Sequence, residues 1–150
     1  MIQTRKELFN KCLNKINGQI EKYRESMKGV KESMEANDVH TDYDEEGSKG
    51  ELLLDFEKYA QYLDNAQKIK ETLSKVDIEH YTEQIKFGSV VETKKQNYFI
   101  AAALGEIKMD DGSMVYVISN EAPIFEQLKA KKAGDTFKLN NEEVQILKVH

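Results

Sequence analysis

Cysteine, proline and tryptophan are scarce in this sequence, which has one cysteine, one proline and no tryptophan among 150 residues. The single cysteine, Cys12, cannot form an internal disulfide, which excludes a disulfide-stabilised fold and favours a reducing cytoplasm. No apolar run of about 18 residues occurs, so we expect no membrane span. The opening MIQTRKELFNK also lacks the apolar segment of a signal peptide.

Conventional catalytic motifs are missing too. There is no GxSxG, no HExxH, no cysteine pair and no phosphate-binding glycine loop. The three histidines, His40, His80 and His150, are dispersed, and we interpret them as surface residues. Cys12 flanks an apolar stripe and is interpreted as a small core residue rather than a nucleophile. A pI near 5.3 argues against broad binding to a phosphate backbone and against sequence-specific DNA binding.

Two heptad patterns dominate the first half of the chain. In the first, the apolar residues are separated by alternating steps of four and three, which predicts a long helix with one apolar seam. Its members are Phe9, Leu13, Ile16, Ile20, Tyr23, Met27, Val30 and Met34. The second pattern consists of Leu52, Phe56, Tyr59, Leu63, Ala66 and Leu73. Capping boxes, Thr4 with Glu7 and Ser48 with Glu51, predict where the two helices start. Two such helices joined by a short connection predict an antiparallel coiled-coil hairpin.

The second half has the alternation of strands. Five runs predict strands, and PIFEQLKAKK, opened by Pro123, predicts one helix among them. The five runs are SVVET, NYFIAA, MVYVIS, TFKL and EVQILKV. We therefore expect an α+β chain with a hairpin domain over residues 1–79 and a mostly antiparallel sheet domain over residues 80–150.

Acidic residues are concentrated between the two heptad patterns. Residues 35–57 hold nine carboxylates and one base, a net charge of −8 in a chain whose total is −5. A solvated turn is the plain interpretation. However, Asp42, Asp44, Glu45 and Glu46 repel one another within five positions, and such crowding favours a cation or a basic partner. We predict a weak magnesium site at Asp42, Asp44 and Glu45, completed by ligands from another protein.

Three motifs in the second half are similar to signatures of the Gre family of bacterial transcript cleavage factors. They are FGSVV at residues 87–91, ISNEAPI at 118–124 and KKAGD at 131–135. Ala122 stands where the family has serine, and Ala130 where it has glycine. The whole chain resembles this family, whose coiled-coil hairpin ends in an acidic tip and precedes an FKBP-like domain. The resemblance implies an FKBP-like fold here, with Ala122, Pro123 and Ile124 as the partner-binding turn.

The tip also resembles the family's motif, since Asp42 and Glu45 keep its D-x-x-E spacing within Asp42–Glu46, although the flanking residues differ. By this resemblance, the hairpin would enter the secondary channel of RNA polymerase. Asp42 and Glu45 would help to hold magnesium near the RNA 3′ end, and the polymerase would cleave backtracked RNA. The chain itself would be a monomeric, cytoplasmic accessory factor rather than an enzyme. A non-cleaving regulator of the channel and a proline isomerase or scaffold are the alternatives, and fold alone is weak evidence for the latter.

Overall fold

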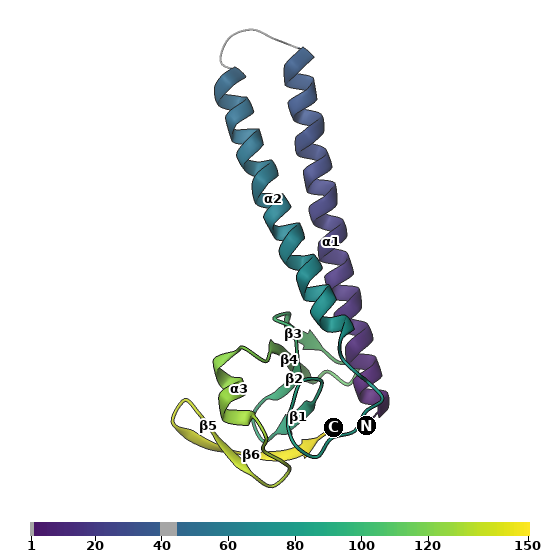
Figure 1. Cartoon of the computed structure of the whole chain (residues 1–150), viewed down its shortest axis with the longest axis vertical. Coiled ribbons are helices and arrows are strands. Elements are labelled where there is room, and N and C mark those ends of the chain that lie inside the picture. The colour runs from purple at the N-terminus through teal and green to yellow at the C-terminus, as the bar shows by residue number, and fades with distance from the viewer. Residues whose placement is uncertain (1, 40–44) are drawn as a thin grey trace. The chain divides into compact units, whose positions relative to one another are not determined.

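The computed structural model describes residues 2–39 and 45–150, and within them the side chains of residues 4–36 and 49–150 (Figure 1). Two long helices, α1 (Ile2–Val39) and α2 (Glu45–Ser74), precede a β-sheet and a short helix α3 (Pro123–Leu128). The strands are β1 (Val90–Thr93), β2 (Asn97–Ala101), β3 (Gly105–Lys108), β4 (Met114–Ser119), β5 (Thr136–Leu139) and β6 (Glu142–Val149). This arrangement confirms the α+β class. Within the described ranges, no helix is both long and apolar enough to cross a membrane.

The chain divides into two compact units, which are described separately. The hairpin unit is Lys15–Lys68, and the β unit combines Met1–Asn14 with Ile69–His150. The β unit therefore includes the start of α1 and the end of α2 as well as the sheet. The expected folding domains, 1–79 and 80–150, stay a prediction.

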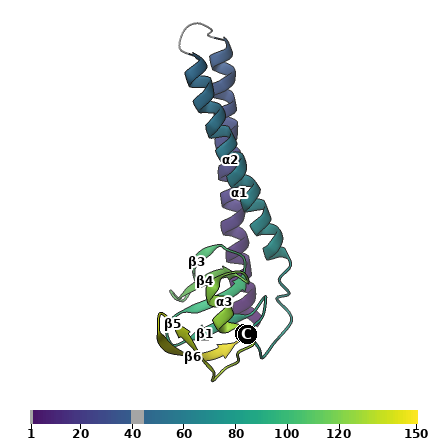
Figure 2. The same ribbon diagram turned by 60° about the vertical axis from the view of Figure 1, so that its left-hand side comes forward.

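In the hairpin unit, α1 and α2 lie side by side in both views (Figures 1 and 2). Ile20 and Ala66 are buried, whereas Tyr23, Met27 and Leu63 are half-buried. Two helices alone share one interface, so most seam residues lose only part of their exposure to solvent. The rings of Tyr23 and Tyr62 also pack, with centroids 5.5 Å apart, although Tyr62 lies outside the predicted seam. The heptad pattern is thus confirmed in this unit.

At the start of α1 the predicted seam is wrong by one position. Leu8 and Cys12 are fully buried, while Phe9 and Leu13 are only half-buried. This part of α1 belongs to the β unit, so its burial does not have to follow the heptads that pair the two helices. The burial of Cys12 confirms that it is a core residue.

Side chains of these first turns bind the rest of the β unit. Arg5 donates hydrogen bonds to the backbone carbonyls of Asp77 and His80. The carboxylate of Glu7 accepts a hydrogen bond of 3.2 Å from the backbone N–H of Asp110. The capping box predicted for Thr4 and Glu7 is therefore wrong, because α1 starts at Ile2 and Glu7 is engaged with the turn before β4.

The sheet has six strands among the described residues, in the order β3-β4-β2-β1-β6-β5. All neighbouring pairs are antiparallel except β2 and β4. The prediction of five strands is wrong because it omits β3, a four-residue strand at one end of that order. The core on one side of the sheet joins strand residues such as Ile100 and Ile146 to Phe125 and Leu128 of α3. α3 is thereby fixed on the sheet.

The ion pair between Lys11 and Asp110 makes a prediction about pH. Lys11 Nζ lies 2.8 Å from Asp110 Oδ1, and this bond lowers the pKa of Asp110 below its ordinary value of 3.8. A carboxylate with a lowered pKa contributes stability above pH 3.8, and that contribution is lost as the pH falls through the folded-state pKa. In Lys11→Gln, the Asp110 carboxyl should titrate closer to 3.8, as followed by carboxyl carbon NMR. An unchanged midpoint would show that Lys11 does not set this pKa.

Candidate functional site

The acidic tip lies between the end of α1 at Val39 and the start of α2 at Glu45. Asp42 and Asp44 lie outside the described residues, and so does the side chain of Glu45. Backbone assignment shows that α2 begins three residues before Ser48, so the predicted capping start at Ser48 is wrong. Glu45 and Glu46 consequently occupy the first turn of α2, where the helix dipole favours negative charge. The magnesium site at Asp42, Asp44 and Glu45 stays a prediction.

The carboxylates that flank the tip are exposed. Glu35 on α1 and Glu51, Asp55 and Glu57 on α2 are all open to solvent. Lys58 Nζ lies 3.9 Å from Asp55 Oδ1, which makes a weak ion pair one turn along the helix. Over the described side chains, no group of three or more histidine, cysteine or acidic residues is placed to hold a metal ion.

Of the described histidines, His80 is exposed, as expected, but His150 is not. His150 is 5% exposed, and its Nε2 lies 3.6 Å from a carboxylate oxygen of Glu92. The prediction of a surface residue is wrong here because His150 continues the β1–β6 ladder. Its backbone N–H donates to the Val90 carbonyl at 2.8 Å, and its own carbonyl accepts from the N–H of Val90 at 3.1 Å.

The predicted partner-binding turn, Ala122–Ile124, forms the start of α3. Ala122 is in an extended conformation, with φ −63° and ψ 140°, and Pro123 follows as the first helical residue. Pro123 is exposed, whereas Ile124 packs against the core. Because proline fixes φ, this arrangement presents the pyrrolidine ring on a rigid turn.

Backbone and side-chain hydrogen bonds hold this turn from both sides. The Ala122 N–H donates to the carbonyl of Ser119 at 3.1 Å, and the Phe125 N–H donates to the carbonyl of Ala122 at 3.0 Å. Ser119 Oγ also accepts a bond from the backbone N–H of Glu121 at 3.2 Å. A turn held in this way loses little conformational freedom when a partner binds it, which favours recognition.

An open groove of about 570 Å³ lies beside α3. Ile85, Phe87 and Phe125 contribute apolar groups to it, and Glu126 and Lys129 contribute charge. Two backbone hydrogen bonds bring the segment before β1 against the end of α3. Lys131 accepts from the N–H of Ile85 at 2.8 Å, and the Ala130 N–H donates to the Ile85 carbonyl at 3.0 Å. No sequence pattern indicates this groove, since its walls come from segments about 40 residues apart.

Ala130 adopts φ +62°, a left-handed conformation that disfavours a β-carbon. Glycine carries no such penalty, so Ala130→Gly should raise the free energy of unfolding by up to about 1 kcal/mol. Ala133 is a matched control, because it is also exposed and in the same connection but has no positive φ. Ala133→Gly should destabilise the protein by about 0.4–1 kcal/mol. Urea unfolding of both variants measures the difference, and equal losses of stability would show that Ala130 carries no strain.

Comparison with known proteins finds similarity among solved structures only. No protein-family model matches this sequence, and no curated protein matches it either. Among solved structures, one described as the structure of the transcription factor Gfh1 is 21% identical over 95% of this chain and 92% of that chain, with a TM-score of 0.35. At this identity and score, the similarity does not assign the chain to a family.

Proposed function

We propose that this chain is a transcription factor that binds RNA polymerase and stimulates the polymerase's own cleavage of backtracked RNA. In this proposal the hairpin enters the secondary channel, and Asp42 and Glu45 help to hold a magnesium ion near the RNA 3′ end. The hydrolysis belongs to the polymerase, so the chain is an accessory factor. It would act in the cytoplasm as a monomer.

The observation that carries this proposal is the place of the acidic residues between two long paired helices. α1 ends at Val39 and α2 begins at Glu45, which leaves Asp42 and Asp44 in a connection confined to residues 40–44. Carboxylates at the end of a narrow helical hairpin can be delivered into a channel that a globular domain cannot enter. One or two carboxylates, with water and phosphate oxygens, are a common ligand set for magnesium.

In this proposal the β unit attaches the chain to the polymerase. The Ala122–Ile124 turn presents an exposed proline on a rigid backbone, with Ile124 anchored in the core. By resemblance to the Gre family, this turn would contact the rim of the secondary channel. The motifs FGSVV and KKAGD carry the same resemblance: FGSVV runs into the first two residues of β1, and KKAGD lies directly before β5.

A second candidate function follows from a specific departure at the tip. Asp42–Glu46 reads DYDEE and continues through glycine and serine, without the residues that follow the acidic pair in the family motif. A tip of this kind on the same hairpin fits a regulator that occupies the channel without promoting cleavage. The two functions share the partner and the docking mode and differ only in the chemistry of the tip.

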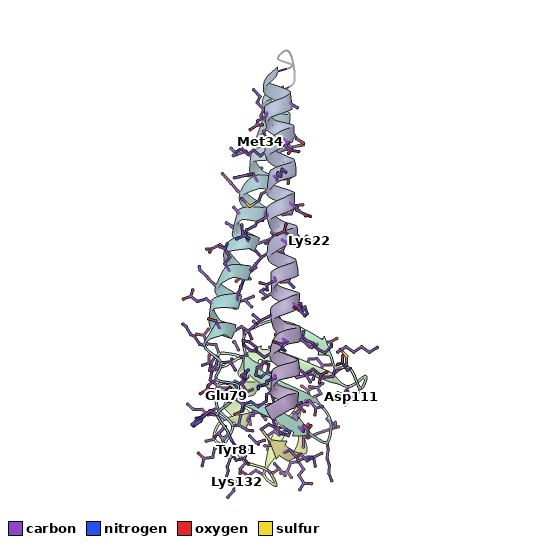
Figure 3. All side chains as sticks on the ribbon, turned by 90° about the vertical axis from the view of Figure 1, so that its right-hand side faces the viewer. Lys22, Met34, Glu79, Tyr81, Asp111 and Lys132 are labelled. Carbon is purple, nitrogen blue, oxygen red and sulfur yellow. The ribbon has the colours of Figure 1, made fainter. Side chains whose placement is uncertain are left out.

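Crosslinking tests whether the tip reaches the polymerase active site. A photoreactive amino acid at Tyr43 should crosslink to the RNA 3′ end or to the polymerase active-site region in a stalled complex. The same group at Tyr81, which is 62% exposed in the β unit and labelled in Figure 3, serves as the control and should not reach the RNA. Binding to polymerase without a crosslink from residue 43 to either target would place the tip outside the channel.

A further inference from the structure

The β unit contains a cavity of about 240 Å³ that is rich in basic groups. Its lining includes Arg5 from α1, Lys75 and Asp77 after α2, and His80, Thr82 and Lys86 from the connection to β1. Glu79 and Tyr81, which flank His80, are labelled in Figure 3. Three permanent cations therefore line the cavity with one carboxylate, in a chain whose net charge is −5. This local excess of positive charge is opposite in sign to the rest of the molecule.

Arg5 is the most constrained group of the cavity. Its side chain is only 3% exposed, and its two terminal nitrogens donate to neutral backbone carbonyls, those of His80 and Asp77. Its Nε is buried and has no hydrogen-bond partner among the described residues. Burial lowers the pKa of Arg5, and the nearby carboxylate of Asp77 only partly offsets this effect. A buried guanidinium without a full counter-charge is costly, and an anion beside it would reduce that cost.

The two lysines complete a site open to solvent. Lys75 and Lys86 are exposed, and within the described part of the chain neither ammonium group forms an ion pair. Asp77 is partly engaged, since its Oδ1 accepts a hydrogen bond of 3.1 Å from the backbone N–H of Glu79. Lysine ammonium groups, a guanidinium and a threonine hydroxyl together are donors suited to phosphate oxygens.

We propose that this cavity binds a small phosphate anion, with a diphosphate group as the preferred ligand. Lys75 and Lys86 would contact the phosphate oxygens directly. The buried positive charge of Arg5 would make the electrostatic potential inside the cavity more positive. A diphosphate suits the cavity because it can span two separate ammonium groups that a single chloride cannot satisfy together. The ligand would bridge the start of α1 and the segment 75–86, so its binding couples these two parts of the β unit. This proposal is independent of any interaction with polymerase.

Titration of the full-length protein with inorganic pyrophosphate, without magnesium and at constant ionic strength, tests the proposal by NMR. Amide signals from residues 75–88 and the Arg5 side-chain N–H should shift along one saturable curve. Lys75→Gln/Lys86→Gln should weaken binding at least tenfold. The matched control, Lys94→Gln/Lys132→Gln, removes the same charge from exposed lysines elsewhere in the β unit and should bind as the wild type does.

Two results would overturn the proposal. One is a set of shifts that do not saturate and that spread over surface lysines generally, which is ion screening alone. The other is equal pyrophosphate binding by the two double variants. Titration with inorganic phosphate then tests the preference for a diphosphate group, and titration with ADP distinguishes the sources of the ligand. Binding of ADP within a few-fold of pyrophosphate supports the diphosphate group of a nucleotide, whereas pyrophosphate binding with ADP excluded supports a free inorganic anion.

Discussion

Combined replacement of Asp42 by Asn and Glu45 by Gln is expected to reduce RNA cleavage more than tenfold. The reason is that a lost metal ligand removes transition-state stabilisation worth more than about 1.4 kcal/mol. Folding and polymerase binding should remain nearly unchanged, because neutralising both groups relieves the repulsion between like charges in the acidic stretch. The measurement is the rate of RNA shortening in backtracked complexes at saturating protein.

The matched control for this prediction is Glu35→Gln with Glu51→Gln. These two carboxylates are exposed and lie on α1 and α2, on either side of the tip. Replacing both removes the same amount of charge from the acidic stretch. If both double variants lose cleavage equally, the general negative charge of the tip matters rather than a ligand pair. If Asp42→Asn/Glu45→Gln cleaves as well as the wild type, the metal has been assigned to the wrong carboxylates.

The second large effect is expected at Leu8. Leu8→Ala should lower the free energy of unfolding by about 2–5 kcal/mol, because the side chain is completely buried and its removal leaves a cavity. Phe9→Ala, at the adjacent half-buried position, should cost less despite the larger side chain. Denaturant unfolding of the two variants measures both values.

The comparison of Leu8 with Phe9 tests whether the first turns of α1 follow the heptad seam or pack within the β unit. A greater loss from Phe9→Ala would mean that the heptad seam continues to the start of the helix. A greater loss from Leu8→Ala would show that the first turns of α1 are part of the β unit. A fragment that starts near Tyr81 lacks Arg5, Leu8 and Cys12. If the first turns of α1 are part of the β unit, this fragment should be less stable than the full-length protein.

The sequence predicted the structure well where the spacing of residues within one helix or strand determines which face is buried. The spacing of Ile16, Ile20 and Tyr23 indicated the helix and the face that it buries. Pro123 marked the first residue of α3, although that helix ends at Leu128 rather than near Lys132. Lys129 leaves helical geometry, with φ −51° and ψ 131°, and Ala130 then adopts positive φ. The lysines and alanine that follow are good helix formers, so local propensity gave no sign of this end.

The remaining differences come from contacts between distant parts of the chain. Arg5 binds carbonyls of Asp77 and His80, and no local pattern announces a partner more than 70 residues away. β3 offers one buried apolar residue, Ile107, after a glycine with φ +86°, so its alternation is too short to recognise. Its pairing with β4 is what makes it a strand. At the candidate site, the predicted partner-binding turn lies at the start of α3, whereas the groove beside it and the basic cavity were not predicted.

The most direct measurement is RNA length in purified, backtracked elongation complexes after addition of the wild-type protein over a range of magnesium concentrations. The protein should shorten the RNA from its 3′ end, at a rate that rises with magnesium until it saturates. Complexes without the protein should shorten their RNA far more slowly. Binding of the protein to these complexes with no gain in RNA shortening at any magnesium concentration would contradict the cleavage function and favour the non-cleaving regulator.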